Sequence, residues 1–505
     1  MANQRPSPPS GPASSPSQLL PWLRQQWLRQ PWLRQPWLRQ PWLRQQWRKQ
    51  LTVPQFTLIT GLLVISSGTL VLASPACSLD SVGLWEALFT VTSAITVTGL
   101  SIIDVGRELT PLGQVVLAGL ILTGGLGLMA ITTFLQGFVQ GRSGLRQRLD
   151  KGRSLDEFGV GGIGPTFHSI LRTASWVMAT GTLILFCFGF NDIRDPGQRL
   201  WASLFHCISA YNNAGFGLWS DNLVQYKGNV VVNGVIGSLI VIGGIGWRVT
   251  NELWSRRGQL GELRLLGGLR HLSLHTRLVL RSTASLIALG ALGLLFTEQF
   301  APDGVVASLN LWEKLQVTVF QSITTRTVGF NTVPLSISTL SDAGLLLMIA
   351  LMFIGASPGG TGGGIKTTTF AILMGATRST LEGRSDVVIR RRQIPGELVL
   401  KAVGVTLASG LFVLLMTLLL GLGPTAGGGA QAQSFTFLEK LFTCMSAFAT
   451  VGLDVGVTAN LNRWGQLVLI VGMFTGRLGV ILLLSALYGR RPRSRVGYPR
   501  EEVLI

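Results

Sequence analysis

The stretch TVTGL at residues 96–100 decides the fold, because related versions of it recur three more times along the chain. Each version holds a single Gly followed by a bulky apolar residue. The intervals between these glycines are 116, 114 and 123 residues, which indicates four copies of one structural unit. The four pairs are Gly99-Leu100, Gly215-Phe216, Gly329-Phe330 and Gly452-Leu453.

The residues that precede each Gly repeat as well. Three copies have Phe ten residues and Ser six residues before the Gly, whereas the third copy has Val319 and Ile323 there. We therefore expect a short helix followed by extended backbone in each copy, and we call the segments 96–100, 212–216, 326–330 and 449–453 the filter strands. The repeated pairs are Phe89 with Ser93, Phe205 with Ser209, and Phe442 with Ser446.

Apolar segments of membrane length flank every copy. The chain is 47% hydrophobic and only 13% charged, whereas soluble proteins carry about 25% charged residues. We predict an all-α membrane protein with eight spans, in which the four shorter stretches are re-entrant and line a watery cavity. The spans lie near 54–73, 115–136, 168–189, 229–247, 278–297, 342–365, 398–420 and 464–487, and the re-entrant stretches near 83–101, 199–218, 312–332 and 436–453.

The basic residues predict the orientation. Lys and Arg gather in the segments 141–168, 248–281 and 366–401, so the net charge of +19 indicates cytoplasmic loops rather than nucleic-acid binding. Both termini are expected in the cytoplasm of a plasma-membrane (cell inner membrane) protein. The expected organisation is a low-complexity tail with PWLRQ repeats (1–53), four repeats (54–140, 141–250, 251–380 and 381–490) and a C-terminal tail (491–505).

The filter strands carry the predicted chemistry. A dehydrated monovalent cation needs a ring of oxygens, and four strands on one pseudo-fourfold axis can supply backbone carbonyls that Gly leaves accessible. The alternative is that these glycines are turn residues in ordinary outer loops. The predicted ion ligands come from Thr96, Val97, Thr98, Gly99, Asn212, Asn213, Ala214, Gly215, Thr327, Val328, Gly329, Thr450, Val451 and Gly452.

Two further features lie in predicted spans. Residues 355–364, which we call the glycine loop, contain six Gly and one Pro, so a continuous helix is not expected. Arg477 lies near the middle of the last predicted span, where a charge is costly unless it faces the pore or a partner group. Arg326 precedes the third Gly and is expected to brace the filter strand from behind. The alternatives are a packing kink for the loop and a helix-tying role for Arg477.

The segments TVTGL (96–100), NNAGFG (212–217), TTRTVGFNT (324–332) and FATVGLD (448–454) resemble the Ktr/Trk/HKT superfamily of K⁺ transporters. The lack of two additional N-terminal spans and the ending YPREEVLI (498–505) resemble a Ktr-type, KtrB-like membrane subunit. The resemblance implies potassium uptake, often sodium-linked, with weaker sodium exclusion than in tetrameric K⁺ channels. It also implies that the glycine loop and Arg477 form a gate. The gate residues are then Gly355, Ala356, Ser357, Gly359, Gly360, Thr361 and Arg477.

The resemblance further implies partners. The membrane subunit is expected to form a homodimer in lipid, and a cytosolic nucleotide-binding, KtrA-like ring is expected to open it. No catalytic triad or metal motif is found in the sequence, so no organic cofactor and no enzyme activity are predicted. The rival interpretation is a non-conducting membrane subunit of a cation-translocating ATPase, which would require an acidic ion-carrying residue in mid-membrane.

Overall fold

The computed structural model describes residues 53–79, 82–127, 163–256, 272–300, 304–336, 339–384, 386–390, 392–423, 435–480 and 483. Val53–Ile505 forms one compact unit. The predicted PWLRQ tail, most of the basic segment 141–168, and the tail 491–505 lie outside the described residues.

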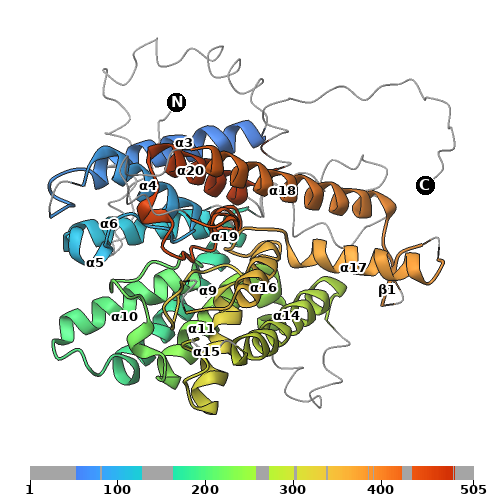
Figure 1. The fold of residues 1–505 in the computed structure, drawn as a ribbon, viewed down its shortest axis with the longest axis horizontal. Helices are drawn as coiled ribbons and strands as arrows, with labels where there is room; N and C mark the ends of the chain where they lie inside the picture. Colours follow the sequence, from blue (N-terminus) through green and yellow to red (C-terminus); the bar gives the residue numbers. More distant parts are fainter. Residues whose placement is uncertain are drawn as a thin grey trace, which may run out of the picture. The chain divides into compact units, whose positions relative to one another are not determined.

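The first half of this unit is helical (Figure 1). Its elements are α3 (Val53–Leu72), α4 (Leu84–Thr96), α5 (Val105–Glu108), α6 (Pro111–Leu122), the π-helix η4 (Thr123–Gly127), α9 (Ile163–Ile184), the π-helix η5 (Leu185–Gly189), α10 (Pro196–Tyr211), the 3-10 turn η6 (Val224–Tyr226), α11 (Val230–Ile245) and α12 (Trp247–Ser255).

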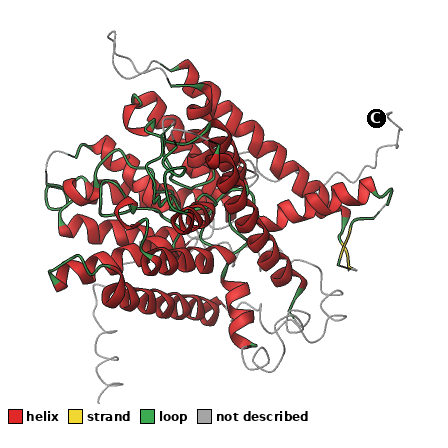
Figure 2. Ribbon diagram, turned by 60° about the horizontal axis from the view of Figure 1, so that its bottom comes forward, coloured by secondary structure: helices red, strands yellow, loops and turns green. Residues whose placement is uncertain are grey.

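The second half adds more helices and one short hairpin, the yellow element in Figure 2. Its elements are α14 (Leu274–Gln299), α15 (Leu311–Thr324), α16 (Asp342–Phe353), α17 (Thr367–Leu381), β1 (Val388–Ile389), β2 (Arg392–Gln393), α18 (Gly396–Leu422), α19 (Phe437–Phe448), the 3-10 turn η8 (Thr458–Asn460) and α20 (Arg463–Leu478).

The short helices α4, α10, α15 and α19 precede the four filter strands, and we call them the pore helices. Three of them begin at a side-chain N-cap, which satisfies backbone N–H groups that have no partner within the helix. Asp195 caps α10, Asn310 caps α15, and Thr436 forms a capping box with Glu439 on α19. The repeated Phe89, Phe205 and Phe442 of these helices are fully buried.

The helices contact one another in a recurring order. Pore helices α4, α10, α15 and α19 contact the helices that precede them, α3, α9, α14 and α18. Each also contacts the helix that follows the filter strand of the preceding copy, through the pairs α6·α10, α11·α15, α16·α19 and α20·α4. The last pair joins the fourth copy to the first, so the contacts close into a cycle. Figure 2 shows loop segments, in green, gathered within the helical body.

Every predicted spanning stretch contains a helix, but the lengths differ. Three described helical segments have the length and hydropathy to cross a membrane, namely His168–Gly189, Leu274–Gln299 and Gly396–Leu422. The pair α11 and α12 passes the same test together but bends by 100°. The helix within the predicted span 342–365 is interrupted as expected, because α16 ends at Phe353 and the glycine loop follows.

The segment between α16 and α18 holds structure that the sequence analysis did not predict. Helix α17 follows the glycine loop, and the antiparallel hairpin pairs Val388 with Gln393 and Ile389 with Arg392. Ile389 of the hairpin covers Gly375 of α17, so the two elements pack on each other. In Figure 1 they lie apart from the pore helices.

Candidate functional site

Three pore helices end in the same hydrogen-bond pattern. Val97 lies in the left-handed region, its N–H donates to the carbonyl of Ala94, and the N–H of Thr98 donates to the carbonyl of Ser93. This pair of bonds is a Schellman motif. It recurs at Asn213 and Ala214 and again at Thr450 and Val451. In each of the three copies, the bond that spans more residues is accepted by the carbonyl of the Ser that lies six residues before the Gly. These residues are Ser93, Ser209 and Ser446.

The third copy ends its pore helix differently. The N–H groups of Thr327 and Val328 both donate to the carbonyl of Thr324, and Thr327 does not adopt a left-handed conformation. This is also the copy whose sequence has Ile323 in place of the repeated Ser. The departure in sequence therefore coincides with a departure in backbone geometry.

The four glycines of the filter strands share one backbone conformation and one kind of contact. Their φ values are 95° at Gly99, 71° at Gly215, 86° at Gly329 and 88° at Gly452, a range that L side chains rarely adopt. A Cβ built on any of them would overlap a carbonyl oxygen of the next strand. The pairs are Gly99 with Ala214, Gly215 with Val328, Gly329 with Val451, and Gly452 with Thr98.

These contacts close a ring. Each glycine lies against the residue that precedes the glycine of the following copy, and the fourth copy returns to the first. The residues Thr98, Ala214, Val328 and Val451 are all 0% exposed, and in the described part of the chain their carbonyl oxygens accept no hydrogen bond. Buried carbonyls are nearly always paired in proteins, so four unpaired ones in a ring are unusual.

Side chains hold the filter strands from outside the ring. The Ser93 hydroxyl accepts from the N–H of Gly99 at 3.0 Å, and the hydroxyls of Thr96 and Thr98 lie 2.8 Å apart. The amide of Asn213 and the hydroxyl of Thr327 lie 2.6 Å apart, and this contact joins the second strand to the third. These bonds occupy side chains and backbone N–H groups but leave the four carbonyls free.

The glycine loop packs directly against the filter strands. Cβ atoms on Gly362 and Gly363 would meet the side chains of Thr327 and Thr450, and the Gly363 N–H donates to the Thr450 hydroxyl at 2.9 Å. The Thr361 hydroxyl donates to the carbonyl of Tyr211, the last residue of α10, at 3.3 Å. The loop therefore touches three of the four copies at the ends of their pore helices.

The end of α11 holds the other side of the glycine loop. The N–H groups of Ser357 and Thr361 donate to the carbonyls of Gly244 and Gly243 at 3.0 and 3.2 Å. After the bend at Gly246, the N–H of Trp247 donates to the carbonyl of Gly359 at 3.2 Å. The bend between α11 and α12 is thus built around the loop.

Arg477 bridges the glycine loop and the first copy. It donates to the carbonyl of Thr361, and its second terminal nitrogen donates to the carbonyl of Gly124 at 2.7 Å. Gly124 lies in the π-helix η4, a helical irregularity that occurs frequently at functional sites. Lys366 donates to the neighbouring carbonyl of Gly362 at 2.8 Å, so two cationic side chains bind adjacent carbonyls of the loop.

Arg326 lies at the other end of the glycine loop. Its guanidinium donates to the carbonyl of Gly355 at 3.1 Å, and the residue is 7% exposed. We expected Arg326 to brace a filter strand from behind. The structure gives it the first residue of the glycine loop as a partner, and its bracing of the strand stays a prediction.

The sequence analysis missed a second set of glycines, which lies on the helices that follow the filter strands. A Cβ on Gly124, Gly243 or Gly476 would overlap the carbonyl of the residue four positions before a filter glycine. The sequence did contain a pattern that could have identified them, because these glycines follow the filter glycines by similar intervals. The carbonyls that they approach belong to Ile95, Tyr211 and Phe448.

Among the residues that the structure describes, no group of three or more His, Cys, Asp or Glu side chains has the arrangement of a metal site. The oxygens gathered at the centre are backbone carbonyls and Thr hydroxyls. Such neutral oxygens suit a weakly held monovalent cation that passes through, rather than a resident divalent metal.

The chain matches a known protein family and several known proteins. Residues 32–488 match the family model TrkH, described as cation transport protein. The Ktr system potassium uptake protein B of Bacillus subtilis is 34% identical over 463 residues, covering 90% of this chain and 96% of that protein. The protein of the same name from Vibrio alginolyticus is 32% identical over 453 residues, covering 89% and 94%.

One further relative and one solved structure are similar to this chain. The potassium/sodium uptake protein NtpJ of Enterococcus hirae is 29% identical, covering 84% of this chain and 90% of that protein. The crystal structure of the potassium transporter TrkH from Vibrio parahaemolyticus superposes with a TM-score of 0.67 at 18% identity, covering 86% and 84% of the two chains. This similarity shows a shared fold. The chain belongs to the Ktr/Trk family of cation transport proteins.

Proposed function

We propose that this chain takes up potassium ions through a single pore formed by its four filter strands. The four copies would then supply eight spans and four re-entrant pore helices around one pseudo-fourfold axis. The cycle of helix contacts and the ring of glycine contacts support this arrangement. The names of the most similar relatives, potassium uptake proteins, support K⁺ as the transported ion.

The observation that carries the proposal is the ring of unpaired buried carbonyls at Thr98, Ala214, Val328 and Val451. An ion that sheds its water needs several oxygens at once, and carbonyls that bond to nothing else can serve without breaking an existing bond. The pore helices end beside these strands, and the partial negative charge of their C-termini favours a cation in the same place.

The remaining assigned filter residues support the strands. Val97, Asn213 and Thr450 hold the left-handed turns that lead into Gly99, Gly215 and Gly452. In the third strand, Thr327 bonds to Asn213 and precedes Gly329 by two residues. Thr96 and Asn212 bond back to the carbonyls of Thr92 and Ile208 in their own pore helices.

The glycine loop and Arg477 form the proposed gate. The loop lies against the filter strands at Thr327 and Thr450, and Arg477 of the neighbouring fourth copy binds it. The positive charge of Arg477 beside the glycine loop raises the energy barrier for a cation that passes the loop. The hydrogen bonds of Arg477 to backbone carbonyls hold its side chain in this position. Opening would then require Arg477 to release Thr361, with Gly355, Ala356, Ser357, Gly359 and Gly360 moving with the loop.

The physiological setting is part of the same proposal. We place the chain in the plasma membrane as a homodimer surrounded by lipid, with both termini in the cytoplasm. A separate KtrA-like nucleotide-binding ring would open the gate from the cytoplasmic loops. The similarity to a potassium/sodium uptake protein supports a role for sodium, as a second transported or coupling ion.

Rescue of potassium-uptake-deficient cells in low potassium tests the proposal. Wild type should rescue growth, Gly99→Ser should weaken potassium uptake or its selectivity, and Arg477→Ala should change gating or speed flux. If wild type fails to rescue even with a Ktr-type regulatory subunit, or Gly99→Ser leaves uptake and selectivity unchanged, the filter assignment is wrong. A non-conducting subunit of a cation-translocating ATPase would then be the better interpretation.

A further inference from the structure

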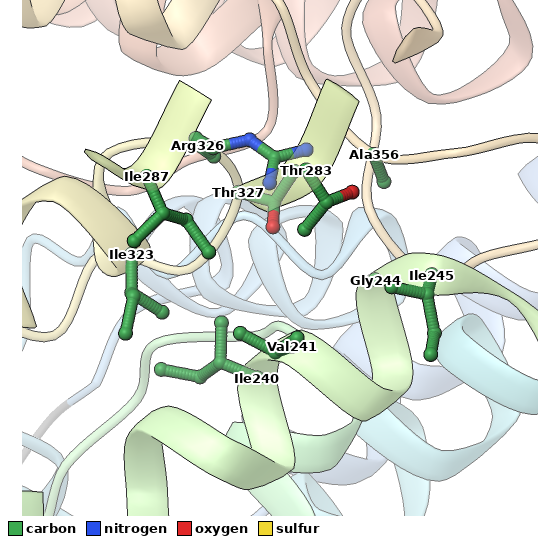
Figure 3. Close-up of a pocket in the computed structure, with 10 residues that line it drawn as sticks. All are labelled: Ile240, Val241, Gly244, Ile245, Thr283, Ile287, Ile323, Arg326, Thr327 and Ala356. Carbon is green, nitrogen blue, oxygen red and sulfur yellow. The ribbon is translucent and has the colours of Figure 1, made fainter. Parts of the chain in front are cut away.

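A small cavity lies behind the third filter strand, between α11, α14 and the first residues of the glycine loop (Figure 3). Most of its lining is aliphatic. Its size suits one water-sized species, which excludes nucleotides, lipid chains and polyatomic cofactors. The polar lining side chains are Arg326, Thr283 and Thr327, and the others belong to Ile240, Val241, Ile245, Ile287, Ile323 and Ala356.

Arg326 brings a positive charge to this cavity without a negative partner. Among the residues that the structure describes, its one hydrogen bond goes to the neutral carbonyl of Gly355, and its buried Nε has no acceptor. Within the described residues, the ion pairs involve Arg107, Arg256, Arg378 and Arg384, and none involves Arg326. A buried guanidinium without a counter-charge is strongly unfavourable, so a negative species at this place would be stabilising.

Thr283 supplies a second unused polar group at the same cavity. Its residue is 6% exposed, and its hydroxyl has no hydrogen-bond partner in the described part of the chain. Figure 3 shows the Arg326 guanidinium and the Thr283 hydroxyl on one side of the cavity, with Ile240 and Val241 on the other. A guanidinium and a hydroxyl are both donors, so the matching ligand is an acceptor.

We propose that this cavity is a binding site for one small halide ion, chloride under physiological conditions, held by Arg326 and Thr283. A monatomic anion matches the space, accepts from both donors and carries the charge that Arg326 lacks. The aliphatic side chains on the far side keep water from competing for the same donors.

The site has a consequence for transport, which rests on the proposed function. Arg326 lies three residues before Gly329 in the third filter strand, where its charge repels a cation in the ring. A bound halide would offset that charge. Potassium would therefore bind the filter more tightly when chloride fills the cavity, although the anion itself is not transported.

Binding is tested first, on the purified full-length chain and without any transport assay. Melting temperature is followed at fixed potassium while gluconate is replaced by chloride or bromide. We expect a saturable rise with either halide. In Thr283→Val the half-saturating concentration should increase about tenfold, the size expected for one hydrogen bond to a charged ligand. Crystals grown in bromide should show anomalous density in the cavity.

Thr417→Val is the matched control, because Thr417 on α18 is 3% exposed, bonds to the carbonyl of Val413, and does not line the cavity. It should keep the full halide response. Arg326→Gln should abolish the halide response. If Arg326→Gln does not fold, the isosteric Thr283→Val still decides the test. Equal melting curves in gluconate and chloride, or equal halide responses in all variants, would show that the cavity holds water only.

Transport is tested separately, by the potassium concentration that gives half-maximal uptake in proteoliposomes containing chloride or gluconate. Chloride should lower this concentration in wild type and in Thr417→Val, but less in Thr283→Val. If halide binds but uptake is the same in both salts, the link to the filter is wrong while the site stands. If neither wild type nor any variant transports potassium, the proposed function itself is wrong.

Discussion

Single residues at the ends of the pore helices carry backbone strain. Val97 and Thr450 have φ values of 50° and 51°, although β-branched residues rarely adopt the left-handed region. Both are fully buried, so the surrounding structure enforces these conformations. Strain of this kind costs about 1–3 kcal/mol and tends to gather at functional sites. Its position beside the unpaired carbonyls agrees with the proposed role of the strands.

A prediction at this scale concerns Ser93, whose hydroxyl accepts from the N–H of Gly99 at 3.0 Å. Ser93→Ala leaves this N–H without a partner, at a cost of about 1–3 kcal/mol. We expect a lower preference for potassium over sodium, measured by competitive uptake in proteoliposomes. Ser409→Ala, at a buried position on α18, is the control. An unchanged ion preference in Ser93→Ala would mean that this bond does not position the strand.

The sequence predicted which residues gather at the centre but not how they bond. Four glycines at regular intervals were sufficient to find the strands. The bond between Asn213 and Thr327 joins two copies that are far apart along the chain, so no local sequence pattern predicts it. The hydrogen-bond partner of Arg326 could not be predicted either, because Gly355 belongs to a separate segment of the chain.

At the scale of elements, glycines set how closely the helices that follow the filter strands approach the pore helices. A Cβ on Gly476 of α20 would overlap the carbonyl of Phe448, whereas a Cβ on Gly119 of α6 would meet nothing within 4 Å. Gly476→Ala should therefore destabilise the protein by about 1–3 kcal/mol through overpacking. Gly119→Ala should stabilise it by up to about 1 kcal/mol through helix propensity.

Thermal unfolding of the two purified variants checks this prediction by the sign of the melting-temperature change. Gly476→Ala should melt below wild type and Gly119→Ala at or above it. A destabilisation of equal size in both variants would mean that glycine flexibility, rather than close packing, matters in these helices.

A second prediction concerns α12, whose first residue Trp247 binds the glycine loop. Glu252 of this helix accepts from the backbone and hydroxyl of Ser273 at 2.8 and 2.7 Å and from Thr276, at the start of α14. Partial burial alone would raise the pKa of Glu252, but these hydrogen bonds and Arg256 together hold the pKa below its usual range. The carboxylate thus fastens α12 to α14.

The sign of the pH effect follows from that lowered pKa. The stabilisation by Glu252 is present above the pKa of an unfolded-state glutamate and is lost as pH falls through the lower native pKa. The melting-temperature difference between wild type and Glu252→Gln should be largest near neutral pH and shrink on acidification. A difference that stays constant from neutral to acidic pH would contradict this role of the carboxylate.

The elements themselves were partly predictable. Membrane-length apolar segments and the shorter, less apolar stretches between them gave the order of helices, because both signals are local. The hairpin and α17 were missed because the segment is basic and only moderately apolar, which suggested a plain loop. The bend at Gly246 depends on the glycine loop more than a hundred residues away, so it too could not be found locally.

At the scale of the whole molecule, the central feature is closure. Helix α20 of the last copy contacts α4 of the first, and Gly452 lies against Thr98. A chain of four copies can close in this way only if each copy presents complementary surfaces to both neighbours. One polypeptide then surrounds one ring of carbonyls, which is the basis of the proposed pore.

The most direct measurement is rubidium and sodium uptake by proteoliposomes containing wild type, Gly215→Ala or Gly404→Ala. A Cβ on Gly215 would overlap the carbonyl of Val328 in the next strand, whereas one on Gly404 of α18 would meet nothing within 4 Å. We predict that Gly404→Ala transports rubidium like wild type, and that Gly215→Ala loses most rubidium uptake or its preference over sodium. Wild-type rubidium uptake and ion preference in folded Gly215→Ala would contradict the account.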